Sequence, residues 1–397
     1  MKGDRATSLR ALPSSSLVYL AFAIAALAVQ VVYWVGLSNG FARVRRDQPQ
    51  KLDGAVSDLW VSVVIAARNE EQNIPALFDA LEAQTHGSFE VIMADDGSTD
   101  GTAGIIDTRA ALWNGRDGPQ LRRIRIEDSE AEATGVPRKK HALTRAIAKA
   151  KHDRLVFTDA DCIPPPDWLA TLARFSAPDG ADNGAVLVGY GPYRKQPGLL
   201  NAFVRYETLL SAFIAASALG WKRPFMAVGR NFSYTKSLFE QIGGFEHSAA
   251  SLSGDDDLLV QEVARRNAAP VRYVFDSNTF VSSGAPATVS GWLRQKLRHT
   301  SAGRYYSRAT KAHLLVFHAS NLLLWLSVPA LWVFSSSWLG AGLLAVRFLV
   351  QRAALRPAER AFCAGDLSLA QPLLDGLYLL YNTFIAPVGS LTKPKRW

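Results

Sequence analysis

A long uncharged segment near the start of the chain constrains its fold more than any other feature. Residues 11–42 contain no charged side chain, and residues 17–37 are apolar except for Gln30. At 1.5 Å per residue, a helix over this run is about 30 Å long, which matches the hydrocarbon core of a bilayer. A secretory signal peptide is the other interpretation, but the run is long for one and lacks a clear small-x-small cleavage site after it. We therefore predict a retained transmembrane anchor over residues 11–42.

Basic residues follow this segment directly. Arg43, Arg45 and Arg46 come next in the chain, and the basic flanks of membrane helices stay on the cytoplasmic side. The sequence therefore predicts that the chain after the anchor faces the cytoplasm, and a bacterial inner membrane is the membrane that we expect.

The C-terminal part of the chain, residues 311–397, is apolar again but less regular. Residues 314–334 form a second run long enough to cross a bilayer. Residues 338–350 are short for a span and include Arg347, so they form either a tilted return span or a segment in the membrane interface. Residues 373–391 are a further candidate. We expect two or three spans here, and the sequence leaves their number open.

The net charge of +9 lies entirely in these two apolar ends. Residues 1–55 carry +4 and residues 311–397 carry +5, whereas residues 56–310 hold 29 basic and 29 acidic side chains. This distribution is typical of membrane flanks, so we expect a membrane partner and no nucleic-acid partner. The two cysteines cannot by themselves form a zinc site or a disulfide framework, and they favour a reducing compartment.

The neutral middle alternates short β-branched runs with longer amphipathic ones. This alternation is typical of βαβ units, which form a parallel sheet covered on both faces, so we expect one α/β domain over residues 56–310. A further run at residues 201–221 places Arg205 and Glu207 on a polar face, and it lies against the membrane or packs on the domain. The expected strands are residues 61–66, 89–94, 121–126 and 154–158, and the expected helices are residues 74–84, 102–113, 140–151 and 254–266.

Polar and acidic residues follow three of the expected strands. Asn69 and Glu70 come after the first strand, Asp96 after the second, and Asp159 with Asp161 after the strand that ends at residue 158. Ligands of open α/β sheets bind at the carboxyl ends of the strands, and carboxylates that meet there repel one another unless a cation lies among them. An Asp-x-Asp pair in a turn can hold one hard divalent cation, although the ordinary interpretation of such a pair alone is a helix cap.

Taken in order, these segments resemble the nucleotide-sugar half of the family 2 glycosyltransferases, which have the GT-A fold. The segments are Val-Ser-Val-Val-Ile-Ala-Ala-Arg-Asn-Glu at 61–70, Ala-Asp-Asp-Gly-Ser-Thr-Asp at 94–100 and Thr-Asp-Ala-Asp at 158–161. The resemblance covers about residues 58–305. It implies a Rossmann-like mixed sheet with flanking helices, together with transmembrane helices at both ends of the chain.

Later segments resemble the acceptor half of the same family. They are Gly-Arg-Asn-Phe at 229–232, Gly-Gly-Phe at 243–245 and Gly-Asp-Asp-Asp-Leu at 254–258. Trp-Leu-Arg-Gln-Lys-Leu-Arg-His at 292–299 is similar to the Gln-x-x-Arg-Trp motif of the membrane-bound members.

The resemblance implies which residues form the nucleotide-sugar site. Asp96 would accept a hydrogen bond from the uracil edge, and Lys140 could take the place of Lys139 near the nucleotide. Mg²⁺ or Mn²⁺ bound to Asp159 and Asp161 would neutralise charge on the leaving diphosphate. The residues implied for this site are Ala67, Asn69, Glu70, Asp96, Lys139 and Asp159.

The general base and the acceptor end follow from the same resemblance. Asp256 matches the second acid of the family's Glu-Asp motif, but a run of three aspartates replaces that motif, so Asp255 is the other candidate. Arg298 would add a cation to the diphosphate, with Gln295 three residues earlier on the same helical face. His299 stands where the family usually has tryptophan, which departs from the expected acceptor site.

Three functions are compatible with these residues. The first is a membrane-bound inverting glycosyltransferase that moves a sugar from a UDP-sugar to a lipid or glycan acceptor, as in ceramide or carotenoid glucosyltransferases. The second is a processive synthase of the cellulose, hyaluronan or poly-N-acetylglucosamine type, although such synthases usually have more spans and carry the tryptophan that His299 replaces. The third is a scaffold that binds nucleotide-sugar without turnover, which the retained acidic residues disfavour. No motif specifies the donor sugar or the acceptor.

Overall fold

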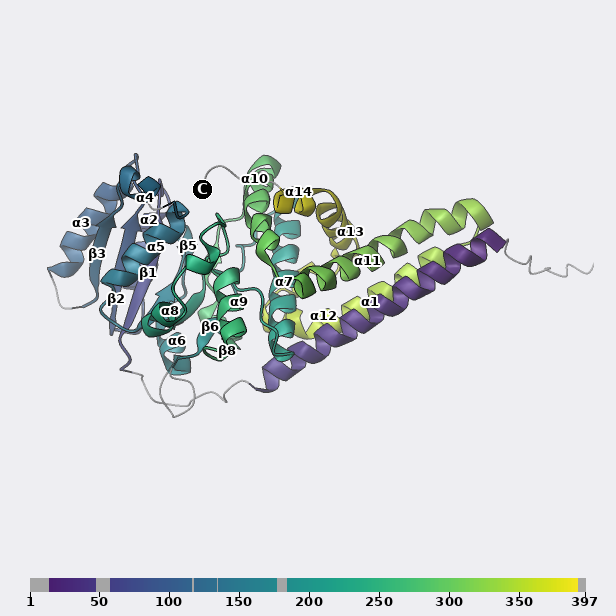
Figure 1. Ribbon diagram of the computed structural model, residues 1–397, viewed down its shortest axis with the longest axis horizontal. Coiled ribbons are helices and arrows are strands. Elements are labelled where there is room, and N and C mark those ends of the chain that lie inside the picture. The colour runs from purple at the N-terminus through teal and green to yellow at the C-terminus, as the bar shows by residue number, and fades with distance from the viewer. Residues whose placement is uncertain (1–13, 48–57, 116–117, 134, 177–183, 392–397) are drawn as a thin grey trace, which may run out of the picture. The chain divides into compact units, whose positions relative to one another are not determined.

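The computed structural model describes residues 14–47, 58–115, 118–133, 135–176 and 184–391. It divides into two compact units (Figure 1). The first unit comprises Met1–Ser38 and Arg308–Arg356, and the second comprises Asn39–Ser307 and Pro357–Trp397. The C-terminal segment after Arg356 therefore groups with the neutral middle of the chain.

The elements alternate between helices and strands through the middle of the chain. The helices are α1 (Ser14–Arg46), α2 (Ile74–Glu82), α3 (Thr102–Asn114), α4 (Asp128–Ala133), α5 (Arg138–Lys149), α6 (Trp168–Ser176), α7 (Leu199–Gly220), α8 (Lys236–Gln241), α9 (Asp257–Arg266), α10 (Val289–Thr300), α11 (Arg308–Ser335), α12 (Leu339–Ala361), α13 (Gln371–Leu380) and α14 (Ala386–Leu391). The strands are β1 (Val61–Ala67), β2 (Phe89–Asp95), β3 (Gln120–Arg125), β4 (Arg154–Phe157), β5 (Cys162–Ile163), β6 (Val186–Val188), β7 (Phe232–Thr235), β8 (Val271–Tyr273) and β9 (Ser282–Ser283).

The second unit contains a seven-stranded sheet in the order β3-β2-β1-β4-β7-β6-β8. The strands β3, β2, β1 and β4 are parallel, whereas β7 is antiparallel to both β4 and β6. The sheet is therefore mixed, which confirms the fold class that the resemblance implies. The βαβ alternation alone predicted only the parallel half, because the short runs that form β6 and β7 do not indicate their direction.

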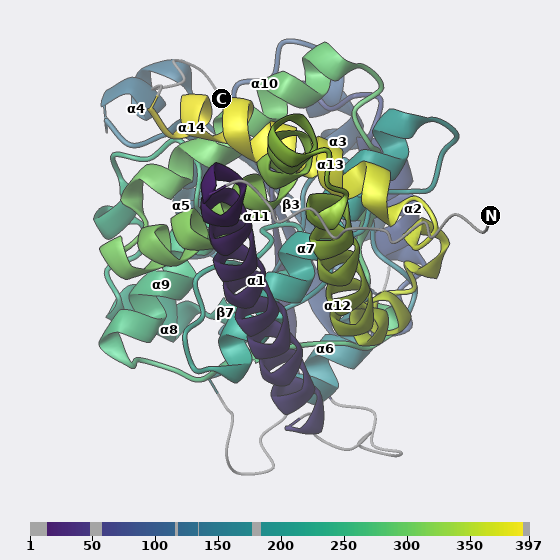
Figure 2. The same ribbon diagram turned by 90° about the vertical axis from the view of Figure 1, so that its right-hand side faces the viewer.

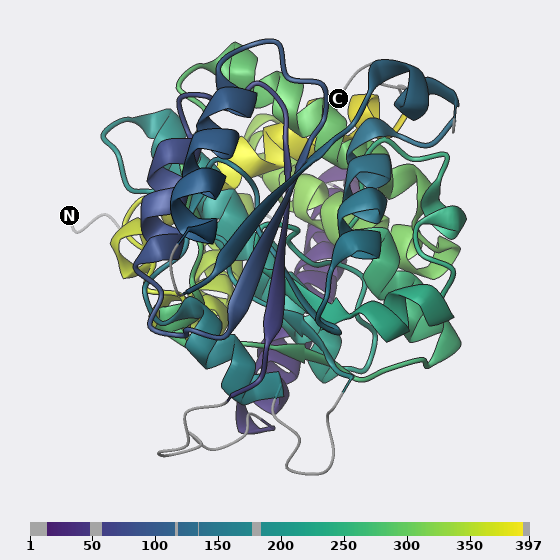
Figure 3. The same ribbon diagram turned by 90° about the vertical axis from the view of Figure 1, so that its left-hand side faces the viewer.

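Helices cover both faces of this sheet, as Figure 3 shows. Val61, Val63 and Ile65 of β1 lie in a buried apolar cluster with residues of α2, α3 and α6. The alternate residues Val64 and Ala66 point to the other face, where α5 packs against β1 and β2. Burial on both faces explains why these strands are continuous apolar runs rather than alternating ones.

The helix α7 packs within the second unit although it is long and apolar enough to cross a membrane. It contacts β8 and α13, and 61% of its most apolar stretch is buried. Glu207, expected on a polar face, is buried instead. Packing on the domain is therefore the arrangement of residues 201–221 in the structure.

Residues 373–391 also pack within the second unit. They form α13, a π-helical turn at Tyr381–Ile385, and α14. Here α13 lies against α7, and α14 lies beside α10 (Figure 2). This segment is not among the described helices with the length and hydropathy of a membrane span.

The first unit is a bundle of the N-terminal part of α1 with α11 and α12 (Figure 1). Gln30 donates hydrogen bonds from Nε2 to the Phe317 carbonyl and to Ser320 Oγ, both at 2.8 Å. Its Oε1 accepts from Arg347 Nε at 3.4 Å, and Arg347 Nη1 donates to Gln351 Oε1 at 2.7 Å. Gln30 of the first apolar run and Arg347 of residues 338–350 thus meet inside the bundle, where both are buried.

Candidate functional site

The carboxyl ends of the parallel strands place the first group of expected site residues at one edge of the sheet. Ala67 pairs in register with Asp95 of β2, and its carbonyl accepts from the Asp96 backbone N–H at 2.9 Å. Asn69 follows with a φ of 56°. Its Oδ1 accepts from the Thr99 N–H at 2.8 Å. The loops after β1 and β2 are therefore tied together.

Asp96 is completely buried at this edge. Its Oδ1 lies 2.9 Å from Arg138 Nη2, and its Oδ2 lies 3.4 Å from Arg68 Nη1. Both oxygens of the residue expected to read the uracil edge are thus paired with arginines.

Glu70 lies near the Asp-x-Asp pair. Burial raises the pKa of Glu70, and the carboxylates of Asp161 and Asp159 raise it further. Its Oε2 accepts from Asn73 Nδ2 at 2.7 Å. The structure therefore brings three acidic residues from the ends of β1 and β4 into one electrostatic environment.

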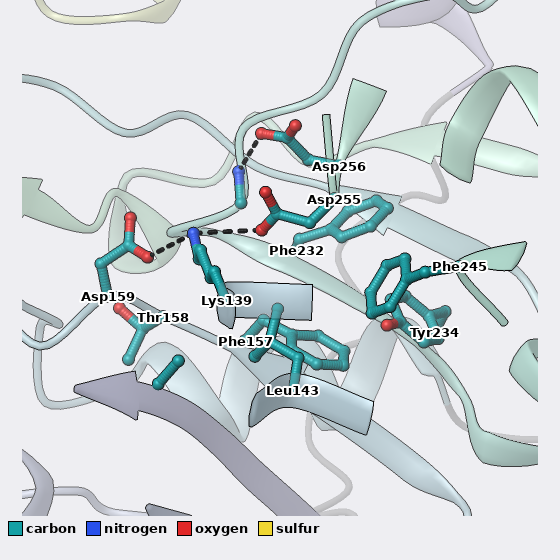
Figure 4. A pocket seen from close by; sticks show the side chains of 12 residues that line it. Lys139, Leu143, Phe157, Thr158, Asp159, Phe232, Tyr234, Phe245, Asp255 and Asp256 are labelled. Atoms are coloured by element: carbon teal, nitrogen blue, oxygen red, sulfur yellow. Dashed lines mark hydrogen bonds and ion pairs between the residues drawn. The ribbon is translucent and has the colours of Figure 1, made fainter. Parts of the chain in front are cut away.

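Lys139 connects this acidic edge to the aspartate run at residues 255–257. Its Nζ lies 3.1 Å from Asp159 Oδ1 and 3.0 Å from Asp255 Oδ2 (Figure 4). Burial alone would lower the pKa of Lys139, but these carboxylates outweigh burial and raise the pKa above its ordinary value. Lys139, the first of the two lysine candidates, is therefore a charged bridge between the two halves of the site.

The three consecutive aspartates have three different environments. Burial would raise the pKa of Asp255, but Lys139 outweighs burial and lowers it. Asp256 accepts from the Gly229 N–H at 2.7 Å (Figure 4) and from the Asp257 N–H at 2.7 Å, and burial together with the Asp255 carboxylate raises its pKa to about 6. Asp257 points elsewhere, because it accepts from the Tyr306 hydroxyl at 2.6 Å.

The side chains of Asp159, Asp161 and Cys162 form a candidate metal centre. One ligand atom from each lies within 4.8 Å of the others. Burial, Asp161 and Asp159 raise the pKa of Cys162 well above its ordinary value, and a thiol is a softer ligand than Mg²⁺ or Mn²⁺ prefers. The two carboxylates alone fit a hard divalent cation of the Mg²⁺ or Mn²⁺ class.

A groove of about 640 Å³ lies between this centre and α10. Asp161, Gln295 and Arg298 line it together with Arg294, which the sequence analysis did not single out. His299 is exposed and is not among the lining residues. Two arginines one helical turn apart thus face the same groove as one expected metal ligand.

Two further residues of this region were not assigned a role from the sequence. Tyr193 accepts a hydrogen bond from Gln295 Nε2 at 3.1 Å, and the Arg230 guanidinium lies over the Tyr193 ring, 4.5 Å from its centroid. The Arg230 charge also opposes the rise in the pKa of Asp161 that burial and Asp159 cause. Arg230 stands inside the Gly-Arg-Asn-Phe motif, which was a signal for it, whereas no motif marks Tyr193.

Two family models match the chain over these segments. The model described as "Glycosyl transferase family 2" matches residues 62–243, and the model described as "Glycosyl transferase family group 2" matches residues 155–354. Together they include every strand-end loop described above and the whole of α10.

Among curated proteins, the glycosyltransferase AglE of Haloferax volcanii is 26% identical over 204 residues, which are 50% of this chain and 59% of that protein. The undecaprenyl-phosphate 4-deoxy-4-formamido-L-arabinose transferase of Aeromonas hydrophila is 32% identical over 117 residues, which are 29% of this chain and 32% of that protein. The chain thus spans less than two thirds of the length of each of these relatives. Among solved structures, a mannosyltransferase from Pyrobaculum calidifontis in complex with GDP-Man and Mn²⁺ aligns with 94% of this chain and 95% of its own, at 18% identity and a TM-score of 0.48.

A buried ion pair fixes α10, the helix that carries Gln295 and Arg298. Lys296 Nζ lies 2.7 Å from Glu207 Oε1 of α7, and both side chains are at least nine-tenths buried. The other oxygen, Glu207 Oε2, is buried without a hydrogen-bond partner in the part of the chain that the structure describes. Removing either partner therefore leaves an uncompensated charge inside the protein.

We expect Glu207→Gln and Lys296→Met each to destabilise the detergent-solubilised protein by about 3–5 kcal/mol. The double variant should lose less stability than either single variant, because it buries no charge. Thermal unfolding followed by tryptophan fluorescence measures this, with Arg125→Met of the exposed Arg125–Glu127 pair as the control. Strictly additive losses in the double variant would contradict the ion-pair account.

Proposed function

This chain belongs to glycosyltransferase family 2, and on that premise we propose that it is an inverting glycosyltransferase that moves a sugar from a UDP-sugar to a hydroxyl of a lipid or membrane-embedded acceptor. The observation that carries the proposal is the contact of Lys139 with both Asp159 and Asp255, at 3.1 and 3.0 Å. It joins the expected diphosphate end of the site to the aspartates that include the expected base.

Asp256 is the general base in this proposal. As the acceptor oxygen bonds to the anomeric carbon, the bond from that carbon to the diphosphate breaks, and Asp256 takes the hydroxyl proton. A base works best when its pKa lies near the operating pH, and the value of about 6 for Asp256 supports this role. Asp255, whose pKa Lys139 lowers, is less suited to it.

The leaving diphosphate needs positive charge around it. Lys139 at the edge of the sheet and Arg298 in the groove supply two cations of the chain itself. A divalent cation bound by Asp159 and Asp161 would neutralise further charge on the diphosphate. Arg294 is placed to contact the same anion or a charged part of the acceptor.

The lipid acceptor is supported by the apolar helices and by a relative. α1 and α11 of the first unit have the length and hydropathy of membrane spans, and the Aeromonas hydrophila relative is named as an undecaprenyl-phosphate transferase. An enzyme anchored in the bilayer reaches a lipid hydroxyl or phosphate-linked sugar without extracting it from the membrane.

We also propose that the first unit crosses the membrane three times, through α1, α11 and α12. Residues 339–356 of α12 lie in the first unit and give a helix of about 27 Å, close to the thickness of the hydrocarbon core. Its Arg347 is buried against Gln30 and Gln351 rather than exposed, and intramembrane charges are tolerated in such settings. Three spans return the chain to the cytoplasmic side before Pro357, where the second unit resumes.

The role of Asp256 predicts the pH dependence of turnover. The carboxylate is the active form of the base, so kcat/KM for UDP release should fall as the pH drops through about 6, the pKa of Asp256. Asp256→Asn should bind UDP but lower kcat by about 100- to 10,000-fold. In Asp255→Asn the acidic limb should move to lower pH, because the negative charge that raises the pKa of Asp256 is gone.

This measurement also distinguishes the two candidate bases. Full activity in Asp256→Asn together with loss of activity in Asp255→Asn would assign the base to Asp255. Binding of UDP by isothermal titration calorimetry serves as the folding control for both variants.

The effect of Mn²⁺ on UDP binding tests whether the carboxylates or the thiol hold the metal. Mn²⁺ should strengthen UDP binding by the wild-type protein, and EDTA should abolish that gain. Asp161→Asn should lose the Mn²⁺ effect, whereas Cys162→Ala should keep it, because the buried Cys162 thiol is a soft ligand that Mn²⁺ does not prefer. Loss of the effect in Cys162→Ala alone would overturn the assignment of ligands.

The three-span topology is tested by labelling single cysteines with a membrane-impermeant maleimide in oriented vesicles. Ser337→Cys, placed in a Cys162→Ser and Cys363→Ser background, lies in the turn between α11 and α12. It should react only from the side opposite to the one from which Cys363, exposed in the second unit, reacts in a separate Cys162→Ser protein. Reaction of both cysteines from the same side would contradict the three spans.

A further inference from the structure

Three consecutive basic residues begin α5, and each has different partners. Arg138 pairs with Asp96, and Lys139 pairs with Asp159 and Asp255. Lys140 turns into the protein and is fully buried. Cations are unfavourable at the N-terminus of a helix, so each needs partners that compensate, and those of Lys140 have no part in the mechanism above.

The ammonium of Lys140 lies in a cage of three backbone carbonyls. Its Nζ donates to the carbonyl oxygens of Ser248 at 2.7 Å, Ser251 at 2.8 Å and Ser253 at 3.1 Å. A lysine ammonium has three N–H donors, so all of them are used. Burial lowers the pKa of Lys140 to about 8 while Asp255 and Asp256 oppose that change, so the group is mostly charged at neutral pH.

The three carbonyls belong to the loop that leads into the base. Residues 249–253 have no helical or strand structure, and Gly254, Asp255 and Asp256 follow directly. Gly254 has a φ of 81°, and a Cβ there would lie 2.8 Å from Leu258 Cγ, so the chain makes a tight turn just before the aspartates. The position of Asp256 therefore depends on where this loop is held.

A second contact holds the same loop from another element. The Tyr305 hydroxyl donates to the Ala250 carbonyl at 2.8 Å. Lys140 and Tyr305 thus tie four carbonyls of residues 248–253 from α5 and from the turn at Ser301–Tyr305.

We infer that Lys140 is a positioning residue for the general base: its ammonium gathers the carbonyls of residues 248–253 and so fixes Asp256 relative to Lys139 and Asp159. The inference rests on the proposed function. Lys139 and Lys140 are adjacent in the first turn of α5. This turn therefore fixes both the ion pairs of Lys139 across the site and the position of the loop that precedes the base. A misplacement of about 1 Å can cost about 100-fold in rate, so such a tie has a direct effect on turnover.

The two adjacent lysines therefore have separate tasks and cannot replace each other. Lys139 contacts carboxylates of the site, whereas the three donors of the Lys140 ammonium go to main-chain carbonyls. An apolar residue at position 140 would avoid burying a charge, but it would leave three carbonyls without this donor.

The first test is Lys140→Met, which keeps an unbranched side chain one heavy atom shorter and removes the ammonium. We expect kcat for UDP release to fall by about 10- to 100-fold, with the Kd for UDP unchanged within about twofold because no donor contact is lost. Lys149→Met, the same change at an exposed position of the same helix, should match the wild type in both quantities. An unchanged kcat in Lys140→Met would overturn the inference.

Chemical rescue separates positioning from simple stability. Lys140→Ala leaves room for n-propylammonium, which supplies the missing methylenes and the ammonium. Added n-propylammonium should restore most of the lost kcat, whereas n-propanol should not, because it has one donor and no charge. Equal rescue by both compounds would mean that volume alone matters and would overturn the cage.

Two further measurements still test the inference if these variants fold poorly or if the proposed function fails. Tyr305→Phe removes one hydrogen bond to the same loop from a partly exposed residue, and it should lower kcat in the same direction by a smaller factor. Hydrogen–deuterium exchange of residues 248–256 should be faster in Lys140→Met than in the wild type, a readout that needs no turnover. A wild type that releases no UDP would defeat the proposed function only, whereas unchanged exchange in Lys140→Met would defeat the inference only.

Discussion

Lys139 makes the contact on which the rest of the site depends. Asp159 follows β4 and Asp255 precedes α9, and these carboxylates would repel each other if nothing lay between them. The Lys139 ammonium lies 3.1 Å from one and 3.0 Å from the other. This bridge lowers the pKa of Asp255, while burial and the Asp255 carboxylate raise the pKa of Asp256 to about 6. Two adjacent aspartates therefore have different pKa values, that of Asp255 lowered and that of Asp256 raised.

The sequence predicts the parallel half of the sheet well because that half is buried on both faces. Residues 61–66 and 89–94 were expected as strands, and β1 and β2 each extend only one residue further. Their acidic ends were expected to meet, since parallel strands end at one edge. The sequence did not predict the strands β6 and β7, which are antiparallel to each other. A strand of three or four residues has no pattern that shows its direction.

Other features depend on contacts between distant residues, which local patterns do not encode. Lys139 and Lys140 look alike in sequence, yet one contacts carboxylates and the other contacts carbonyls. Glu207 was expected on a polar face because its partner, Lys296, comes from another helix. Residues 373–391 are apolar enough to suggest a span. A segment that packs against α7 and α10 needs the same apolar side chains as a segment that lies in lipid.

Two polar residues in the apolar helices are also explained by a contact between distant segments. Gln30 interrupts the first apolar run, and Arg347 stood against a third span, yet the two meet inside the bundle. Both anomalies of the pattern are thus explained by one buried contact. The second unit holds the candidate site, whereas most of α1 and all of α11, which have the length and hydropathy of membrane spans, lie in the first unit.

Product analysis with purified protein tests the central claim most directly. The protein would be incubated with Mn²⁺, host membrane lipids and a panel of labelled UDP-sugars, and the lipid extract analysed by thin-layer chromatography and NMR. The account predicts a lipid that carries a single labelled sugar, with the anomeric configuration opposite to that in the donor. A long labelled polymer, retention of configuration, or no transfer from any donor would contradict it.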